Sequence, residues 1–157
     1  MESSQLKMSI LVVDDCKDAC ETLRLIIKAK FPDITIYMAG NGVIGLDLFR
    51  KYMPDIVITD INMPEMDGIQ MATKIKSVRN DARFIVITAN TDEELLGKFN
   101  EIGYVDFIIK PIVFIRLFAA IGKCFAELAQ GSLSFAGTRR ILSHSKVTSG
   151  IPLTLVA

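Results

Sequence analysis

Polar side chains follow four separate apolar runs of this chain, at the point where each run ends. The runs and the residues that end them are 10–13 with Asp14 and Asp15, 56–59 with Asp60, 84–87 with Thr88, and 107–109 with Lys110. Short apolar runs rich in β-branched residues are typical of buried parallel strands. Because the carboxyl ends of parallel strands meet at one edge of a sheet, we expect three carboxylates, a hydroxyl and an ammonium to converge on one site.

The three carboxylates of this site would repel one another unless a cation compensates them. A hard divalent ion with oxygen ligands suits such a set, and Mg²⁺ keeps waters where protein ligands run out. Asp15 and Asp60 could bind the ion directly, and Asp14 directly or through water. A main-chain carbonyl near Asn62 could complete the shell. The pattern therefore predicts a magnesium site.

A carboxylate beside a bound cation can also act as a nucleophile and form an aspartyl-phosphate. The cation shields the incoming phosphoryl group from the carboxylate charges. Lys110 would supply a positive charge to the phosphoryl oxygens, and Thr88 would supply a hydrogen-bond donor. Since phosphoryl transfer depends mostly on positioning and charge stabilisation, these residue types suit it.

Strands and helices alternate along the sequence that must carry these side chains. The predicted strands are 8–13, 34–38, 56–59, 84–87 and 105–109. The predicted helices are 17–30, a segment capped by Asn41 and ended before Pro54, a segment through Ile69, Ala72 and Ile75, a segment capped by Asp92, and a last helix that ends near Gln130. This order implies right-handed crossovers and an α/β fold with a doubly wound parallel sheet.

The last predicted helix is apolar on more than one face. Its predicted core stripe, at helical spacing, is Phe114, Phe118, Ile121, Phe125 and Leu128. Further apolar surface comes from Val113, Ile115, Leu117 and Ala120. A helix that is apolar on more than one face must bury more than one face. We therefore hypothesise that part of this surface meets a second copy of the chain, as a homodimer, or the segment 131–157.

Composition excludes several classes of protein. The chain has 157 residues with 18 basic and 18 acidic side chains, so its formal net charge is zero. This size suits one domain over residues 6–130, followed by a tail or linker over residues 131–157. The lack of a basic excess argues against direct binding of nucleic acid. No apolar run reaches membrane-spanning length and the three cysteines form no CxxC pair, so we expect a reduced, cytoplasmic protein that does not contact a membrane.

Four motifs of the chain, taken together, resemble those of the response regulator receiver domain of two-component signalling. The motifs are Asp14-Asp15, the segment Asp60-Ile-Asn-Met-Pro-Glu-Met-Asp-Gly68, Thr88-Ala89 and Lys110-Pro111. They fall in the order and on the strands that the family requires, and the similarity covers about residues 8 to 128. The resemblance implies a flavodoxin-like (βα)5 sheet with strand order 2-1-3-4-5, and a cis peptide bond between Lys110 and Pro111.

The resemblance also implies a role for each site residue. The implied roles are Asp60 as phosphoacceptor, Asp14, Asp15, Asp60 and the Asn62 main chain as Mg²⁺ ligands, and Thr88 and Lys110 as contacts of the phosphoryl group. The phosphoryl donor would be a sensor histidine kinase or a phosphotransfer protein. Such a domain would be a signalling switch with at most autophosphorylation from small phosphodonors and autodephosphorylation, not a dedicated enzyme.

The implied switch runs through Thr88 and an aromatic side chain. Thr88 would move toward the phosphoryl group and draw inward Phe107, which lies three residues before Lys110. Phe107 stands where the family more often has tyrosine, and it has no hydroxyl. Any switching through this ring must therefore rest on burial alone. The surface that changes would bind a downstream protein.

Two other interpretations account for part of the pattern. The segment Gly40-Asn-Gly42-Val-Ile-Gly45 fits the dinucleotide-binding motif GxGxxG, with Asp60 following it. Nucleotide binding, however, leaves four of the polar residues without a role, namely Asp14, Asp15, Thr88 and Lys110. The other interpretation is a dormant receiver that folds, binds a partner and is never phosphorylated.

Overall fold

The computed structural model describes residues 7–89 and 91–130. The strands are β1 Ser9–Val13, β2 Thr35–Ala39, β3 Ile56–Thr59, β4 Arg83–Thr88 and β5 Asp106–Ile109. The helices are α1 Lys17–Lys30, α2 Gly42–Tyr52, α3 Gly68–Val78, α4 Glu93–Ile102 and a last helix over residues 114–130. The chain divides into two units, Met1–Gly122 and Lys123–Ala157, and β1 to β5 all lie in the first.

The strands form one parallel sheet in the order β2-β1-β3-β4-β5, which confirms the predicted doubly wound, flavodoxin-like topology. Val13 at the end of β1 pairs with Thr59 at the end of β3, and Thr88 of β4 pairs with Ile109 of β5. The residues that follow these strands therefore lie along one edge of the sheet. Strand order reverses at β1, so the crossovers diverge there and leave a crevice beyond the ends of β1 and β3.

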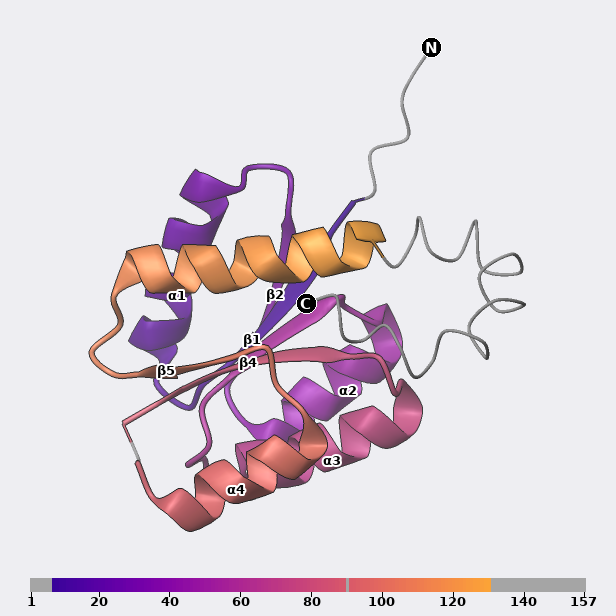
Figure 1. The fold of residues 1–157 in the computed structure, drawn as a ribbon, viewed down its shortest axis with the longest axis vertical. Helices are drawn as coiled ribbons and strands as arrows, with labels where there is room; N and C mark the ends of the chain where they lie inside the picture. The colour runs from indigo at the N-terminus through magenta and orange to yellow at the C-terminus, as the bar shows by residue number, and fades with distance from the viewer. Residues whose placement is uncertain (1–6, 90, 131–157) are drawn as a thin grey trace, which may run out of the picture. The chain divides into compact units, whose positions relative to one another are not determined.

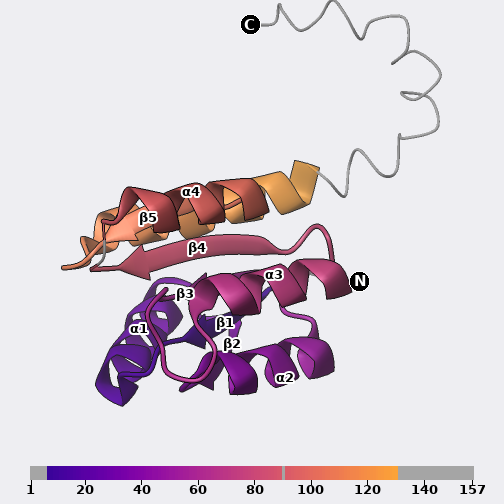
Figure 2. The same cartoon turned by 90° about the horizontal axis from the view of Figure 1, so that it is seen from below.

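Both faces of the central strands are buried. The side chains of Leu11, Val13, Val57, Phe84 and Val86 belong to one core cluster with residues of α2, α3 and α4. Figure 1 shows these three helices on one face of the sheet and α1 on the other, and Figure 2 shows α2, α3 and α4 following one another in that order. Burial on both faces explains why β1, β3 and β4 are apolar at nearly every position.

Side-chain caps fix where three of the helices begin. The predicted caps are confirmed: Asn41 Oδ1 accepts a hydrogen bond from the Ile44 amide, and Asp92 Oδ1 accepts one from the Glu94 amide. The cap of α3 was not predicted. There the Asp67 carboxylate accepts from the Gln70 amide while the Gln70 side chain accepts from the Asp67 amide, which is a capping box.

The predicted core stripe of the last helix is wrong at its first residue. Phe114 is 42% exposed, whereas Leu117 and Ile121 are fully buried. Phe118 is half-buried and packs edge-on against Phe31 just after α1. Because almost every position at the start of this helix is apolar, the sequence pattern leaves its rotation open.

Several predictions concern residues or properties that the structure leaves untested. The boundary after residue 130 stays a prediction, and the segment 131–157 with its hypothesised contact lies outside the described residues. Within the described part of the chain, no helix is both long and apolar enough to cross a membrane. The cytoplasmic location stays a prediction.

Truncation of Phe49 tests the core cluster. This α2 side chain is 0% exposed and belongs to the cluster. Because a cavity forms where the ring was, Phe49→Ala should lower the free energy of unfolding by about 3 to 5 kcal/mol. Leu25→Ala is the control, since Leu25 on α1 is 55% exposed and its loss should change stability by about 0.5 kcal/mol or less. Urea unfolding followed by circular dichroism measures both, and equal losses would contradict the described core.

Candidate functional site

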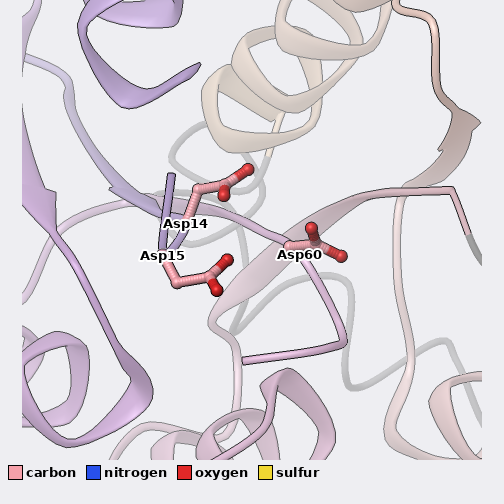
Figure 3. Close-up of side chains that lie close together, drawn as sticks. All are labelled: Asp14, Asp15 and Asp60. Atoms are coloured by element: carbon pink, nitrogen blue, oxygen red, sulfur yellow. The ribbon is translucent and has the colours of Figure 1, made fainter. Parts of the chain in front are cut away.

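Three carboxylates meet at the edge of the sheet, as predicted. Asp14 and Asp15 follow β1, Asp60 follows β3, and their ligand oxygens all lie within 4.8 Å of one another. Figure 3 shows the three side chains gathered at the ends of the two strands. Asp14 is 4% exposed and Asp60 9% exposed, while Asp15 is open to solvent. The cluster can thus be reached from solvent on the Asp15 side.

Lys110 provides the positive charge for this cluster. Its Nζ lies 2.8 Å from Asp60 Oδ2 and 3.2 Å from Asp14 Oδ2. Partial burial alone would lower the pKa of Lys110, but the hydrogen bond to Asp60 and the charges of Asp14 and Asp60 raise it above its ordinary value. The ammonium is therefore charged at neutral pH. Any stability it contributes is lost only as the pH rises through that raised pKa.

Main-chain amides hold the other oxygen of each buried carboxylate. The Ile61 amide donates to Asp60 Oδ1 at 2.6 Å, and the Cys16 amide donates to Asp14 Oδ1 at 2.9 Å. Both oxygens of Asp60 and both of Asp14 thus have a donor. Four directed contacts fix the orientation of the two carboxylates before any ligand arrives, which is the form of preorganisation that phosphoryl transfer requires.

Gly68 fixes the loop behind Asp60, and the sequence pattern alone did not reveal this. A Cβ at Gly68 would lie 2.1 Å from the Asp60 carbonyl oxygen, so only glycine fits. The Gly68 amide also donates to the Ile61 carbonyl at 2.8 Å. The loop from β3 to α3 therefore closes directly onto the segment that carries Asp60. The Met-Asp-Gly sequence that begins α3 was the available signal.

The remaining predicted site residues lie at different depths. Thr88 is fully buried at the end of β4, and its carbonyl accepts a hydrogen bond from the Lys110 amide at 3.0 Å. Asn62 is exposed, two residues after Asp60. Phe107 lies outside the carboxylate cluster: it packs against the core cluster, and its ring meets that of Tyr104 at 5.7 Å. The Lys110–Pro111 bond is cis, as the resemblance implied.

The glycines of the GxGxxG segment pack against protein atoms. A Cβ at Gly42 would lie 2.5 Å from the Met66 carbonyl oxygen, and one at Gly45 would lie 2.7 Å from the Met71 sulfur. Gly42 therefore makes room for the loop after β3, and Gly45 makes room for α3. This close packing explains both glycines without a nucleotide.

A pocket of about 470 Å³ opens beside the cluster, between the start of α1 and the end of β2. Cys20 lines it, and its thiol donates to the Asp14 carbonyl at 3.4 Å. Burial, and next the charge of Asp14, raise the pKa of Cys20 to about 11. The thiol is therefore neutral at physiological pH, which leaves the carboxylates as the anionic ligands at this edge.

Comparison with known proteins relates both sequence and fold to one family. The family model described as "Response regulator receiver domain" matches residues 10–122. The chemotaxis protein CheY of Bacillus subtilis is 33% identical over 115 residues, which cover 73% of this chain and 94% of that protein. A crystal structure of the CheX-CheY-BeF3-Mg²⁺ complex from Borrelia burgdorferi contains a chain that is 28% identical. It matches 75% of this chain and 89% of that chain with a TM-score of 0.70.

Some relatives are much longer than this chain. The probable C4-dicarboxylate response regulator DctR of Bacillus subtilis is 36% identical over 85 residues. The match covers 54% of this chain and only 38% of DctR. Relatives of this kind therefore carry further sequence beyond the matched region.

Substitution of Gly68 tests the loop that holds Asp60. Gly68→Ala should lower the free energy of unfolding by about 1 to 3 kcal/mol, because the new Cβ overlaps the Asp60 carbonyl. Gly97→Ala is the matched control. No atom lies within 4 Å of a Cβ at this position in α4, so the same change should raise stability by up to about 1 kcal/mol. Urea unfolding measures both variants, and a neutral Gly68→Ala would contradict the close contact.

Removal of Lys110 tests whether the carboxylates form a cation site. Lys110→Met takes an ammonium away from Asp14 and Asp60, so a divalent cation should meet less repulsion there. We expect the dissociation constant for Mg²⁺, measured by calorimetric titration, to fall about tenfold. In the control Lys98→Met, the lost charge is an exposed one on α4 that pairs with Glu94, and the dissociation constant should not change. Equal affinities in all three proteins would contradict the assigned site.

Proposed function

This chain belongs to the response regulator receiver domain family, and from that premise we propose that it is a phosphorylation switch in which Asp60 accepts the phosphoryl group. Domains of this family act in two-component signalling and are not dedicated enzymes. One observation carries the proposal. Asp60 belongs to the carboxylate cluster, with Lys110 on one oxygen and the Ile61 amide on the other.

The reaction uses groups that already surround Asp60. A carboxylate oxygen of Asp60 attacks phosphorus, and the bond from phosphorus to the donor atom breaks with its electron pair remaining on the donor. The donor atom is a histidine nitrogen of a kinase or phosphotransfer protein, or the acyl oxygen of a small phosphodonor. The product is an acyl phosphate on Asp60, and Lys110 lies beside it to balance the added negative charge. Hydrolysis of the acyl phosphate by water restores the carboxylate.

The donor set fits Mg²⁺. Three carboxylates with oxygens within 4.8 Å of one another provide the hard ligands that this ion prefers. Asp14, Asp15 and Asp60 would hold it, together with the main-chain carbonyl of Asn62. When bound, the ion supplies charge neutralisation at the phosphoryl oxygens. A chain of the CheX-CheY-BeF3-Mg²⁺ complex from Borrelia burgdorferi is 28% identical to this one, and the Mg²⁺ and BeF3 named in that complex support the assignment.

The switch runs from Asp60 to the surface of β4 and β5. Thr88 ends β4 and is paired in register with Ile109 of β5. After Thr88 shifts toward the phosphoryl group, its hydroxyl donates a hydrogen bond to that group. The Phe107 ring then moves inward. Phe107 already packs against the core cluster, so a modest further burial completes the change. The altered surface then binds a downstream protein.

Phosphorylation by acetyl phosphate tests the proposal. With Mg²⁺ present, the intact mass should increase by one phosphoryl group, because Asp60 is the oriented nucleophile. The increase should be absent in EDTA and absent in Asp60→Asn, which keeps the size of the side chain. Asp55→Asn is the matched control: Asp55 accepts a hydrogen bond from the Ser9 amide and lies just before β3, at the opposite end from the cluster. This variant should be phosphorylated like the wild type.

Two results would contradict the proposal. A phosphoryl group retained in Asp60→Asn would place the acceptor elsewhere. A folded wild-type protein that gains no phosphoryl group and does not bind beryllofluoride in a titration with Mg²⁺ would be a dormant interaction module. The beryllofluoride titration separates this case from rapid hydrolysis, because the complex it forms mimics the acyl phosphate and does not hydrolyse.

A further inference from the structure

The segment that runs from Lys110 into the first turn of the last helix has few buried side chains. Val113 is 61% exposed, Phe114 42% and Ile115 80%. At the start of the same segment, however, the Lys110 ammonium lies within hydrogen-bond distance of Asp14 and Asp60. Apolar packing alone therefore restrains this loop only weakly.

Arg116 closes this loop from its far end. Its Nη2 donates to the Phe107 carbonyl at 2.9 Å and pairs with Asp106 Oδ1 at 3.2 Å. Its own amide donates to the Val113 carbonyl at 3.0 Å. One side chain in the first turn of the last helix thus reaches back to β5. The chain from Phe107 to Arg116, with Lys110 inside it, forms a closed loop.

We propose that Arg116 is a positioning residue for phosphoryl transfer, which holds the loop so that the Lys110 ammonium lies between Asp14 and Asp60. Arg116 does not touch the reacting atoms and acts only through Lys110. This inference rests on the proposed function of Asp60 as phosphoacceptor. It adds Arg116, which lies outside the carboxylate cluster, to the residues that determine the rate of phosphoryl transfer.

The expected effects separate positioning from stability. The Arg116 side chain is 53% exposed, and ion pairs exposed to solvent contribute little to folding. A purely structural role therefore predicts a small loss of stability and an unchanged rate. A charged group must be held closely to stabilise a transition state, and small displacements produce large losses of rate.

Arg79 is a matched control at the other end of the sheet. Its Nε pairs with Asp81 at 2.8 Å, and its Nη1 donates to the main-chain carbonyls of Met53 and Pro54 at 3.2 and 3.4 Å. Arg79 thus makes the same kinds of contact as Arg116, an ion pair and hydrogen bonds to main-chain carbonyls. It does so where α2 and α3 end, away from the carboxylates.

The experiment compares Arg116→Gln, Arg116→Lys and Arg79→Gln with the wild type. The first readout is the rate of phosphorylation by acetyl phosphate with Mg²⁺, followed by intact mass. We expect Arg116→Gln to lower this rate about tenfold, Arg116→Lys to restore part of it, and Arg79→Gln to leave it unchanged. Urea unfolding of each variant shows whether a change in rate exceeds the change in stability.

A second readout requires no phosphoryl transfer. Acetic anhydride acetylates lysine amines in proportion to their access, and peptide mass spectrometry reports the yield at Lys110. The yield should rise several-fold in Arg116→Gln and not in Arg79→Gln, with the yield at Lys98 as an internal reference. If the wild type neither gains a phosphoryl group nor binds beryllofluoride, the proposed function fails, and this labelling still decides whether Arg116 holds Lys110 in place.

The inference is overturned if Arg116→Gln matches the wild type in both readouts. It is also overturned if Arg79→Gln and Arg116→Gln lower the rate equally, because the effect would then follow general stability. Should Arg116→Gln fail to fold, Arg116→Lys is judged by the same two readouts. A rate and a Lys110 labelling yield equal to those of the wild type would then overturn the inference.

Discussion

The charge balance between Lys110 and two buried carboxylates is the interaction on which the rest of the site depends. Asp14 and Asp60 are each less than a tenth exposed, and two neighbouring anions at that depth repel one another strongly. The ammonium that lies within 3.2 Å of both removes that repulsion. The ammonium follows β5 at the edge of the sheet, so it reaches the carboxylates only when β1, β3, β4 and β5 are assembled.

This arrangement connects the stability of the domain with its chemistry. A cation and a phosphoryl group would both enter a site whose carboxylates already have donors on both oxygens. Binding must therefore rearrange existing contacts, with Lys110 moving from carboxylate oxygens toward phosphoryl oxygens. The main-chain amides of Cys16 and Ile61 lie in the loops that follow β1 and β3 and need not move. Amides that stay in place and one ammonium that moves suit a site that gains and loses a phosphoryl group in turn.

Two loops connect Asp60 and Lys110 to other elements at this edge of the sheet. The loop after β3 closes on Asp60 through Gly68, and it also packs on Gly42 at the start of α2 through Met66. The loop after β5 carries Lys110 and is closed by Arg116. Any change at Asp60 is thus next to the beginnings of α2 and α3 and to the turn that begins the last helix.

The sequence by itself determined the strands, the sheet type and the convergence of Asp14, Asp15, Asp60 and Lys110. A buried parallel strand requires a continuous apolar run, and the residue after such a strand lies at the edge where the strands end. Tertiary structure alone decided the rest. The contact of Gly68 with the Asp60 carbonyl, the reach of Arg116 back to β5 and the exposure of Phe114 depend on how loops return to the sheet. No local periodicity encodes these, because each arises from two segments that meet only in the folded chain.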